Sequence, residues 1–212
     1  MNAATRPEGM IIEGIMTTLG EDADDGSMPE RWNIAPMGPI VDGNFSRFIL
    51  RPFKTATTYR NLSRTGQGVF HVTDDALMIA RSAVGGAVSL EAGAWRRADR
   101  VDGVVLTGAC RYYELQVKKF DDREDRTTFE AGVVAAGTLR EFLGFNRARH
   151  AVVEAAILAT RVMLTGSEPI LEQFAHFDRI VEKTGGPSEW QAMAELRQYV
   201  ESSSRDAATE GA

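Results

Sequence analysis

The first 140 residues alternate between short apolar runs and polar turns, a pattern that predicts β-strands. Six runs are expected to be strands, and they lie at residues 10–18, 31–41, 46–52, 68–72, 104–119 and 127–138. The last two flank the polar segment FDDREDR and predict a long antiparallel hairpin. Pro36 and Pro39 exclude a helix at 31–41 and predict an edge strand or an interrupted one. Because only short helices separate the runs, the pattern favours a small antiparallel barrel.

A short helix is expected after the third strand. The apolar spacing changes to three residues at Ala56, Tyr59 and Leu62, and Gly66 follows in the position of a helix C-cap. The pattern therefore predicts a helix at 55–65, and a strand resumes directly after it.

Helical periodicity returns at 73–85, which starts with Thr-Asp-Asp and ends at a glycine, and it dominates the chain after Leu139. The later helices are expected at 146–164, 167–186 and 188–202. We expect two domains, a barrel at 1–140 and a helical C-terminal subdomain at 141–204, followed by a disordered tail at 205–212. The predicted fold class is mainly β with α.

The charge of the chain limits its partners. With 212 residues, 43% of them hydrophobic, the chain can bury an ordinary core. Its net charge of −6 argues against nucleic acid or an anionic membrane as a partner. Residues 151–212 are the most acidic part. Any anion that the protein binds must therefore be held by a local group of cations.

Cysteine content and apolar stretches indicate a cytoplasmic location. The single Cys110 excludes an internal disulfide and a cysteine-based zinc site, and it fits a reducing compartment. Residues 1–10 have no apolar core of a signal peptide. The longest apolar stretch, 151–164, is interrupted by Glu154 and Arg161, so it is too short and too charged to span a bilayer.

The three histidines do not predict a metal site. His71, His150 and His176 are too far apart in sequence for a ligand pair, and no cysteine or carboxylate ladder accompanies them. A structural role is the plainer interpretation of each. His71, inside an apolar strand, could alternatively point into a ligand pocket.

A cluster of cations and hydroxyls begins where the third strand ends, in RPFKTATTYRNL. The start of the predicted helix brings together Arg51, Lys54, Thr55, Thr57 and Thr58. Free N–H groups at a helix N-terminus favour an anion, so the cluster has the outline of a phosphate site. The plainer alternative is that Thr55 or Thr57 caps the helix while Arg51 and Lys54 are solvated.

A second segment favours the phosphate interpretation. NIAPMG, at 33–38, is interrupted by proline, and its exposed backbone groups could meet the polar edge of a flat heteroaromatic ring. It precedes the cluster at 51–58 by one strand. A ring at one end and a phosphate at the other describe FMN.

The order of short motifs supports this interpretation. N-x-A-P at 33–36, T-x-x-N-L at 58–62 and T-G-x-x-V-F-x-V at 65–72 resemble the FMN-binding split barrels of the flavin reductase and pyridoxamine oxidase type. More closely, the chain resembles the family called domain of unknown function 447. That resemblance extends through 144–161 and covers nearly the full length.

The resemblance implies a six-stranded Greek-key split barrel and a homodimer with FMN as cofactor near the subunit interface. Thr58 would contact the phosphate together with neighbours among Arg51, Lys54, Thr55 and Thr57. The segment that would border the isoalloxazine, largely through backbone atoms, comprises Asn33, Ala35, Pro36 and Met37. Asn61 and Leu62 would hold the helix in place. Ala35 departs from the pattern, because many flavin reductases have serine there.

Asn146 and Arg147 begin a predicted helix whose polar positions allow two interpretations. They form part of a solvated face or an intrahelical network of charges. Alternatively they cover the flavin site and bind an anionic substrate through the guanidinium of Arg147.

Two functions fit these features. The first is an FMN-dependent oxidoreductase that takes a hydride from a reduced nicotinamide nucleotide and passes electrons to a small acceptor. The cofactor does such chemistry, so no catalytic side chain is assigned. The second is a non-catalytic flavin-binding or scaffold protein whose acidic helical part contacts a partner. A link to pterin-dependent one-carbon metabolism rests on the resemblance alone.

Overall fold

The computed structural model describes the backbone of residues 9–20, 32–86, 88, 90 and 93–210, and side chains up to residue 203. The chain forms two compact units. The barrel unit comprises 1–73 and 90–141, and the helical unit comprises 74–89 and 142–212. Residues 74–89 thus lie in the helical unit, whereas the sequence pattern placed them in the barrel.

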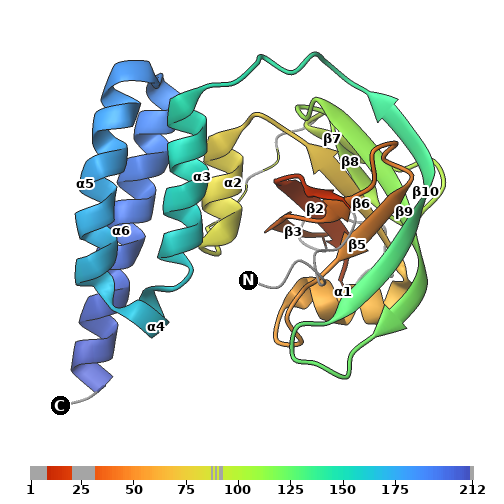
Figure 1. Ribbon diagram of the computed structural model, residues 1–212, viewed down its shortest axis with the longest axis horizontal. Helices are drawn as coiled ribbons and strands as arrows, with labels where there is room; N and C mark the ends of the chain where they lie inside the picture. Colours follow the sequence, from red (N-terminus) through yellow and green to blue (C-terminus); the bar gives the residue numbers. More distant parts are fainter. Residues whose placement is uncertain (1–8, 21–31, 87, 89, 91–92, 211–212) are drawn as a thin grey trace. The chain divides into compact units, whose positions relative to one another are not determined.

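The barrel unit is an antiparallel sheet of eight strands that curls into a half-barrel (Figure 1). In spatial order its strands are β1 (Met10–Ile11), β4 (Ile40–Val41), β5 (Arg47–Leu50), β10 (Thr128–Thr138), β9 (Arg111–Asp121), β6 (Gln67–Val72), β2 (Gly14–Leu19) and β3 (Trp32–Met37). A separate ribbon pairs β7 (Trp95–Arg97) with β8 (Val104–Leu106). The predicted architecture, mainly antiparallel β with C-terminal helices, is confirmed.

The prediction of six strands was wrong, because turns divide three of the apolar runs. Run 10–18 gives β1 and β2, and run 31–41 gives β3 and β4. The second break falls at Gly38 and Pro39, where Pro39 has no N–H for a ladder. Run 104–119 is divided by a turn in which Ala109 N–H donates to the Leu106 carbonyl, so that β8 joins the ribbon.

β3 lies at an edge of the sheet, as the prolines of the run 31–41 predicted. Among the described residues it pairs with β2 alone, and the register places Pro36 opposite Ile15 and Asn33 opposite Thr18. Proline is tolerated in an edge strand because one side of the backbone has no ladder to complete. The open side of β3 therefore offers backbone groups to another partner.

The helix predicted at 55–65 is α1 (Thr57–Thr65). It ends as expected, because Gly66 adopts the left-handed conformation at φ 65° and its N–H donates to the Leu62 carbonyl over 2.8 Å. Leu62 is buried in the core of the barrel unit beside Phe48 and Phe70. This burial fixes the side of α1 that faces the sheet.

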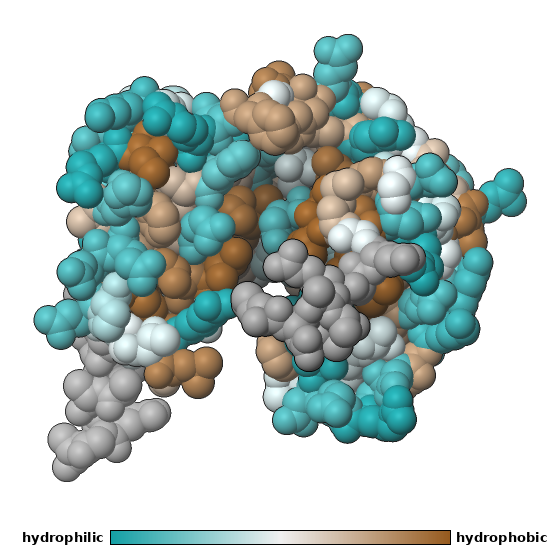
Figure 2. Space-filling view, viewed as in Figure 1, coloured by the Kyte–Doolittle hydropathy of each residue, from teal (hydrophilic) through white to brown (hydrophobic). Residues whose placement is uncertain are grey.

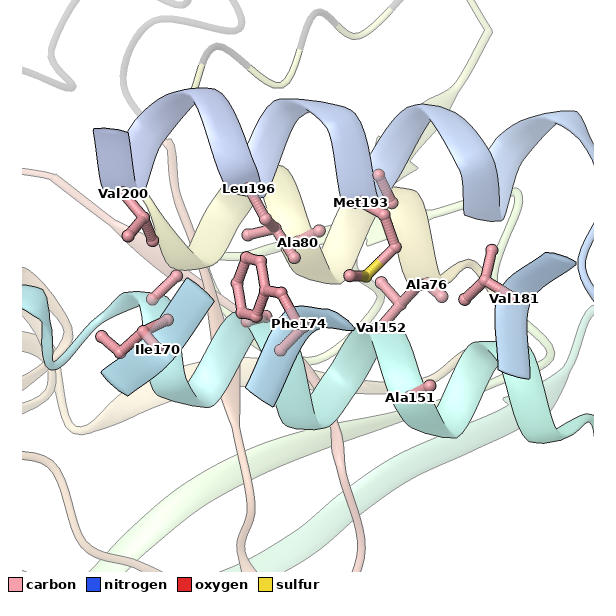
Figure 3. Packing of buried hydrophobic residues seen from close by; sticks show 14 of the residues in the cluster. Ala76, Ala80, Ala151, Val152, Ile170, Phe174, Val181, Met193, Leu196 and Val200 are labelled. Carbon is pink, nitrogen blue, oxygen red and sulfur yellow. The ribbon is translucent and has the colours of Figure 1, made fainter. Parts of the chain in front are cut away.

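Five helices form the helical unit: α2 (Ala76–Ala83), α3 (Arg147–Ala159), α4 (Val162–Thr165), α5 (Ser167–Thr184) and α6 (Pro187–Glu210). Figure 3 shows how larger side chains such as Phe174 and Leu196 fill the space between the helices. Small residues of α2 and α3, including Ala80 and Ala151, let the backbones approach each other. The helices predicted after residue 146 are thus present, and the first of them is divided in two.

Two boundaries differ from the sequence pattern. α2 belongs to the helical unit because its buried Ala76 and Ala80 lie in the same apolar cluster as Phe174. α6 continues to Glu210, past residue 205 where a disordered tail was expected, and residues 211–212 lie outside the described part. Ala207 and Ala208, strong helix formers, favour this extension.

The surface drawn in Figure 2 is largely hydrophilic over α5, in keeping with the amphipathic pattern of that helix. Among the described residues, no helix is both long and apolar enough to cross a membrane.

His71 is a core residue of the barrel unit, fully buried in β6. Its Nδ1 donates to the Ile15 carbonyl over 3.2 Å, and its Nε2 accepts the Leu106 N–H over 3.0 Å. The imidazole therefore connects β6 to β2 and to the β7–β8 ribbon in its neutral form. Burial lowers the pKa of His71 to about 4, against the weaker opposing effect of the bond to Ile15.

We expect the fold to lose stability as the pH falls from 6.5 towards 4. In this window the unfolded chain binds a proton at His71 that the folded chain excludes, so acid favours unfolding. The loss at pH 5 relative to pH 7 should be on the order of 2 kcal/mol. Urea unfolding at both pH values measures it, and His71→Gln should remove most of the difference. An undiminished difference in that variant would contradict the assignment.

Candidate functional site

A cavity of about 270 Å³ lies in the barrel unit, where four segments meet. They are the end of β3, the segment after β5, the start of α1 and the tip of the β9–β10 hairpin. The lining residues are Ala35, Pro36, Met37, Gly38, Arg51, Pro52, Phe53, Ala56, Thr58 and Arg126. None of these is acidic. The volume is near the lower end of small-molecule pockets, roughly 300–1,000 Å³.

Two guanidinium groups make the cavity cationic. The Nε of Arg51 is buried and has no hydrogen-bond partner among the described residues. Burial lowers the pKa of Arg51, and the positive charge of Arg126 lowers it further. Neither arginine has an ion pair among the described residues. A buried donor without a partner is costly, so this arrangement suits an anion that would complete it.

The start of α1 adds to the positive potential. The N-cap residue, Ala56, offers no side-chain acceptor, and the first turn of the helix contains no acidic residue. The hydroxyl of Thr57 is exposed and accepts from Arg60 over 2.9 Å, so it does not cap the helix. The first N–H groups of a helix lack intrahelical partners and favour negative charge. The alternative in which Thr55 or Thr57 caps the helix is thus not what the structure shows.

A network of polar side chains from β2, β3 and α1 holds Thr58 in place. Its hydroxyl accepts the Asn33 amide over 2.9 Å, and the amides of Asn33 and Asn61 both donate to Thr18. Because the hydroxyl oxygen of Thr58 already accepts from Asn33, its own hydrogen is available to a ligand. Thr58 is only 3% exposed, and it lines the cavity.

The segment 52–54 is joined to the base of the hairpin tip. The carbonyl of Pro52 accepts both the N–H and the hydroxyl of Thr127, at 3.1 and 2.7 Å. The N–H of Lys54 donates to the backbone carbonyl of Asp125, and Phe53 pairs with Arg126 in an isolated antiparallel bridge. These bonds hold Arg126 beside Arg51 although 75 residues separate them in sequence.

Of the nine residues proposed from the sequence to contact a cofactor, five line the cavity: Ala35, Pro36, Met37, Arg51 and Thr58. Asn33 does not line it and instead positions Thr58. Lys54, Thr55 and Thr57 also lie outside the lining. Asn61 and Leu62 hold α1 against the sheet, as the resemblance implied, since both are buried.

Asn146 and Arg147 lie in the helical unit. Asn146 caps α3, because its side chain accepts the Arg149 N–H over 3.1 Å and donates to the Thr184 carbonyl over 2.9 Å. This structural role accounts for Asn146. His150, on the same helix, lies edge-on to Phe145, and the centroids of the two rings are 5.9 Å apart. No group of three or more His, Cys, Asp or Glu suited to a metal occurs among the described residues.

Sequence analysis missed Gly38, Pro52, Phe53, Ala56 and Arg126. Four of these adjoin predicted site residues, so proximity in sequence could have found them. Arg126 had no such signal, because its polar segment is typical of a solvated hairpin tip. Its guanidinium lies over the ring of Phe53, 5.6 Å from the centroid, and Phe53 is 56% exposed.

The fold is thus of the mainly β class, a curled antiparallel half-barrel with C-terminal helices, and a cationic cavity lies beside its edge strand β3. The family model described as protein of unknown function (DUF447), N-terminal domain, matches residues 13–140, and its C-terminal counterpart matches 146–198. The chain therefore belongs to the DUF447 family.

One solved structure agrees with this assignment, and two others are less similar. An FMN-bound DUF447 protein from Methanosarcina mazei is 26% identical, with a TM-score of 0.74 over 91% of this chain and 96% of that one. A 2-nitrobenzoate 2-nitroreductase from Pseudomonas fluorescens is 17% identical, with a TM-score of 0.47 over 64% and 66% of the two chains. The styrene monooxygenase flavin reductase from Pseudomonas putida is 16% identical, with a TM-score of 0.46 over 61% and 82%.

We expect Thr58→Val to lower the free energy of unfolding by about 1–3 kcal/mol, because it leaves the Asn33 amide without its best acceptor. Thr57→Val, one position earlier on the same helix, should change it by less than about 0.5 kcal/mol, since that hydroxyl is exposed. Chemical denaturation of the two variants measures the difference. Equal effects would contradict the role of the buried network.

Proposed function

We propose that the barrel unit binds FMN, with the phosphate of the flavin at Arg51, Thr58 and the start of α1. The observation that carries this proposal is the buried Nε of Arg51, which has no partner among the described residues and belongs to a cavity whose described lining contains no acidic residue. Membership of the DUF447 family supports it, because an FMN-bound member covers nearly the whole chain.

The donors and surfaces around the cavity fit the parts of FMN. A phosphate accepts strong hydrogen bonds, which a guanidinium, a hydroxyl and a helix N-terminus supply. Ala35, Pro36 and Met37 line the cavity from an edge strand, so apolar side chains and unpaired backbone groups are both available to a flat ring. We assign Asn33 the task of positioning Thr58.

We infer further that the protein is an FMN-dependent oxidoreductase acting on an unidentified small molecule. Bound FMN would supply hydride and electron transfer, while Arg51 and Thr58 anchor and orient it. An FMN-bound member of the same family is consistent with a flavin-dependent function. A homodimer, reduced nicotinamide as electron donor and a cytoplasmic location stay predictions from the sequence.

A non-catalytic flavin-binding role is the second candidate. One observation favours it: the described residues that line the cavity include no carboxylate, histidine or cysteine, and Thr58 is the one residue among them with a hydroxyl. Ala35 in particular has no hydroxyl to offer to a flavin. Catalysis would then depend on the flavin and on substrate binding alone, or be absent.

Purified protein that has been soaked with FMN and desalted should retain visible flavin absorption bands. Arg51→Ala should weaken FMN binding roughly 10–100-fold, since hydrogen bonds to charged groups contribute about 1.5–3 kcal/mol. Arg47→Ala, an exposed arginine at the start of β5, is the matched control and should bind normally. Protein that retains no FMN would refute the proposed cofactor.

Oxidation of NADH or NADPH by the FMN-loaded protein distinguishes the two candidate functions. An oxidoreductase should turn over faster than the same concentration of free FMN when supplied with a panel of small acceptors. Stopped-flow reduction of the bound flavin, followed by its visible absorption, gives the rate directly. Tight FMN binding without any reduction by either nucleotide would favour the binding protein.

A further inference from the structure

The tip of the β9–β10 hairpin carries two arginines with different surroundings. Arg123 is 86% exposed in its side chain and forms an ion pair with Asp121. Arg126, three residues later, is also exposed, but it lines the cavity and forms no ion pair among the described residues. The two residues have the same charge and the same hairpin, but only one of them faces a ligand site.

Arg126 has a fixed position. Its backbone pairs with Phe53, its Nε lies 3.4 Å from the Arg51 carbonyl, and its guanidinium covers the Phe53 ring. The bonds from Thr127 to Pro52 continue the same connection. The fold therefore holds the backbone of Arg126 at the cavity, and its exposed side chain lies within reach of the Arg51 carbonyl and the Phe53 ring.

Two guanidinium groups without a counter-ion repel each other, and burial increases the cost for Arg51. A ligand with two negative charges on one group offsets this repulsion best. A terminal phosphomonoester carries about −1.5 to −2 charges near neutral pH, because its second pKa is about 6. A phosphate within a diphosphate linkage carries one charge and has fewer free oxygens.

We propose that Arg126 is a second phosphate ligand, which makes the cavity select a terminal phosphomonoester and hence FMN over riboflavin and FAD. This inference rests on the proposed function, since it concerns the same cavity. Arg51 and Arg126 belong to the two segments that this bridge joins and both line the cavity, so each guanidinium contributes its own donors. Selectivity is the difference between the binding free energies of two ligands. The second cation increases this difference, because it strengthens the binding of the dianionic phosphate of FMN more than that of the other two flavins.

The test compares Arg126→Ala with Arg123→Ala by the quenching of flavin fluorescence on binding. Arg126→Ala should weaken FMN roughly 10–100-fold and riboflavin less than about twofold, so that the preference for FMN over riboflavin and FAD falls. Arg123→Ala removes the same charge from the same hairpin and should leave all three affinities unchanged. Arg126→Lys, which keeps the charge but loses the planar fork, should give an intermediate FMN affinity.

Unfolding curves of each variant show whether the hairpin is intact. Wild-type protein that binds FMN while Arg126→Ala binds it equally well overturns this inference and leaves the proposed function standing. Equal losses of FMN and riboflavin in Arg126→Ala also overturn it, because they indicate a damaged cavity rather than a lost phosphate ligand. Wild-type protein that binds no flavin overturns the proposed function, and this inference with it.

Discussion

The carbonyl of Pro52 is the point on which the architecture of the cavity depends. It accepts two hydrogen bonds from Thr127, which is fully buried, and so joins the segment after β5 to the base of the long hairpin. Pro52 has no N–H of its own and a restricted backbone, which favours a single path for the chain. In sequence, Arg51 precedes Pro52 and α1 begins at Thr57. The hairpin tip pairs with the segment between them through the bridge of Arg126 to Phe53.

A second constraint is a network of hydrogen-bonded polar side chains. Thr18, Asn33, Asn61 and Thr58 form one polar network between β2, β3 and α1, so the helix that borders the cavity is connected to the edge strand that also borders it. Buried polar groups of this kind stabilise only one arrangement, because any slip of register leaves a donor unsatisfied. The position of the Thr58 hydroxyl, which lines the cavity, is thus determined by residues that do not line it.

Local signals predicted part of the site. The prolines of the run 31–41 indicated an edge strand, Gly66 indicated the end of α1, and Arg51 and Thr58 lay within one short cationic segment. The order of motifs gave the family. Arg126 could not be predicted, because its place depends on the register of the β9–β10 hairpin and on a bridge to Phe53.

The fold was predicted to a similar degree and for similar reasons. Apolar runs marked where strands occur, yet the turn at Gly38 and Pro39 divides one run in a way that hydrophobicity does not show. The role of Asn33 required the pairing of β2 with β3, which sets it opposite Thr18. The apolar positions of α2 do not indicate which of the two units the helix packs in. Long-range pairing therefore accounts for most of what sequence reasoning missed.

The insertion of α2 affects how the protein can be divided. The chain leaves the barrel unit after Thr73, returns at Leu90 and leaves again after Glu141, so no single cut separates the units. A fragment that stops at Glu141 would retain α2 without Phe174 and Leu196, and would expose Ala76 and Ala80 to water. An isolated barrel needs a short loop between Thr73 and Leu90 as well as a new C-terminus. The two units are thus interleaved along the chain, and truncation at one point does not separate them.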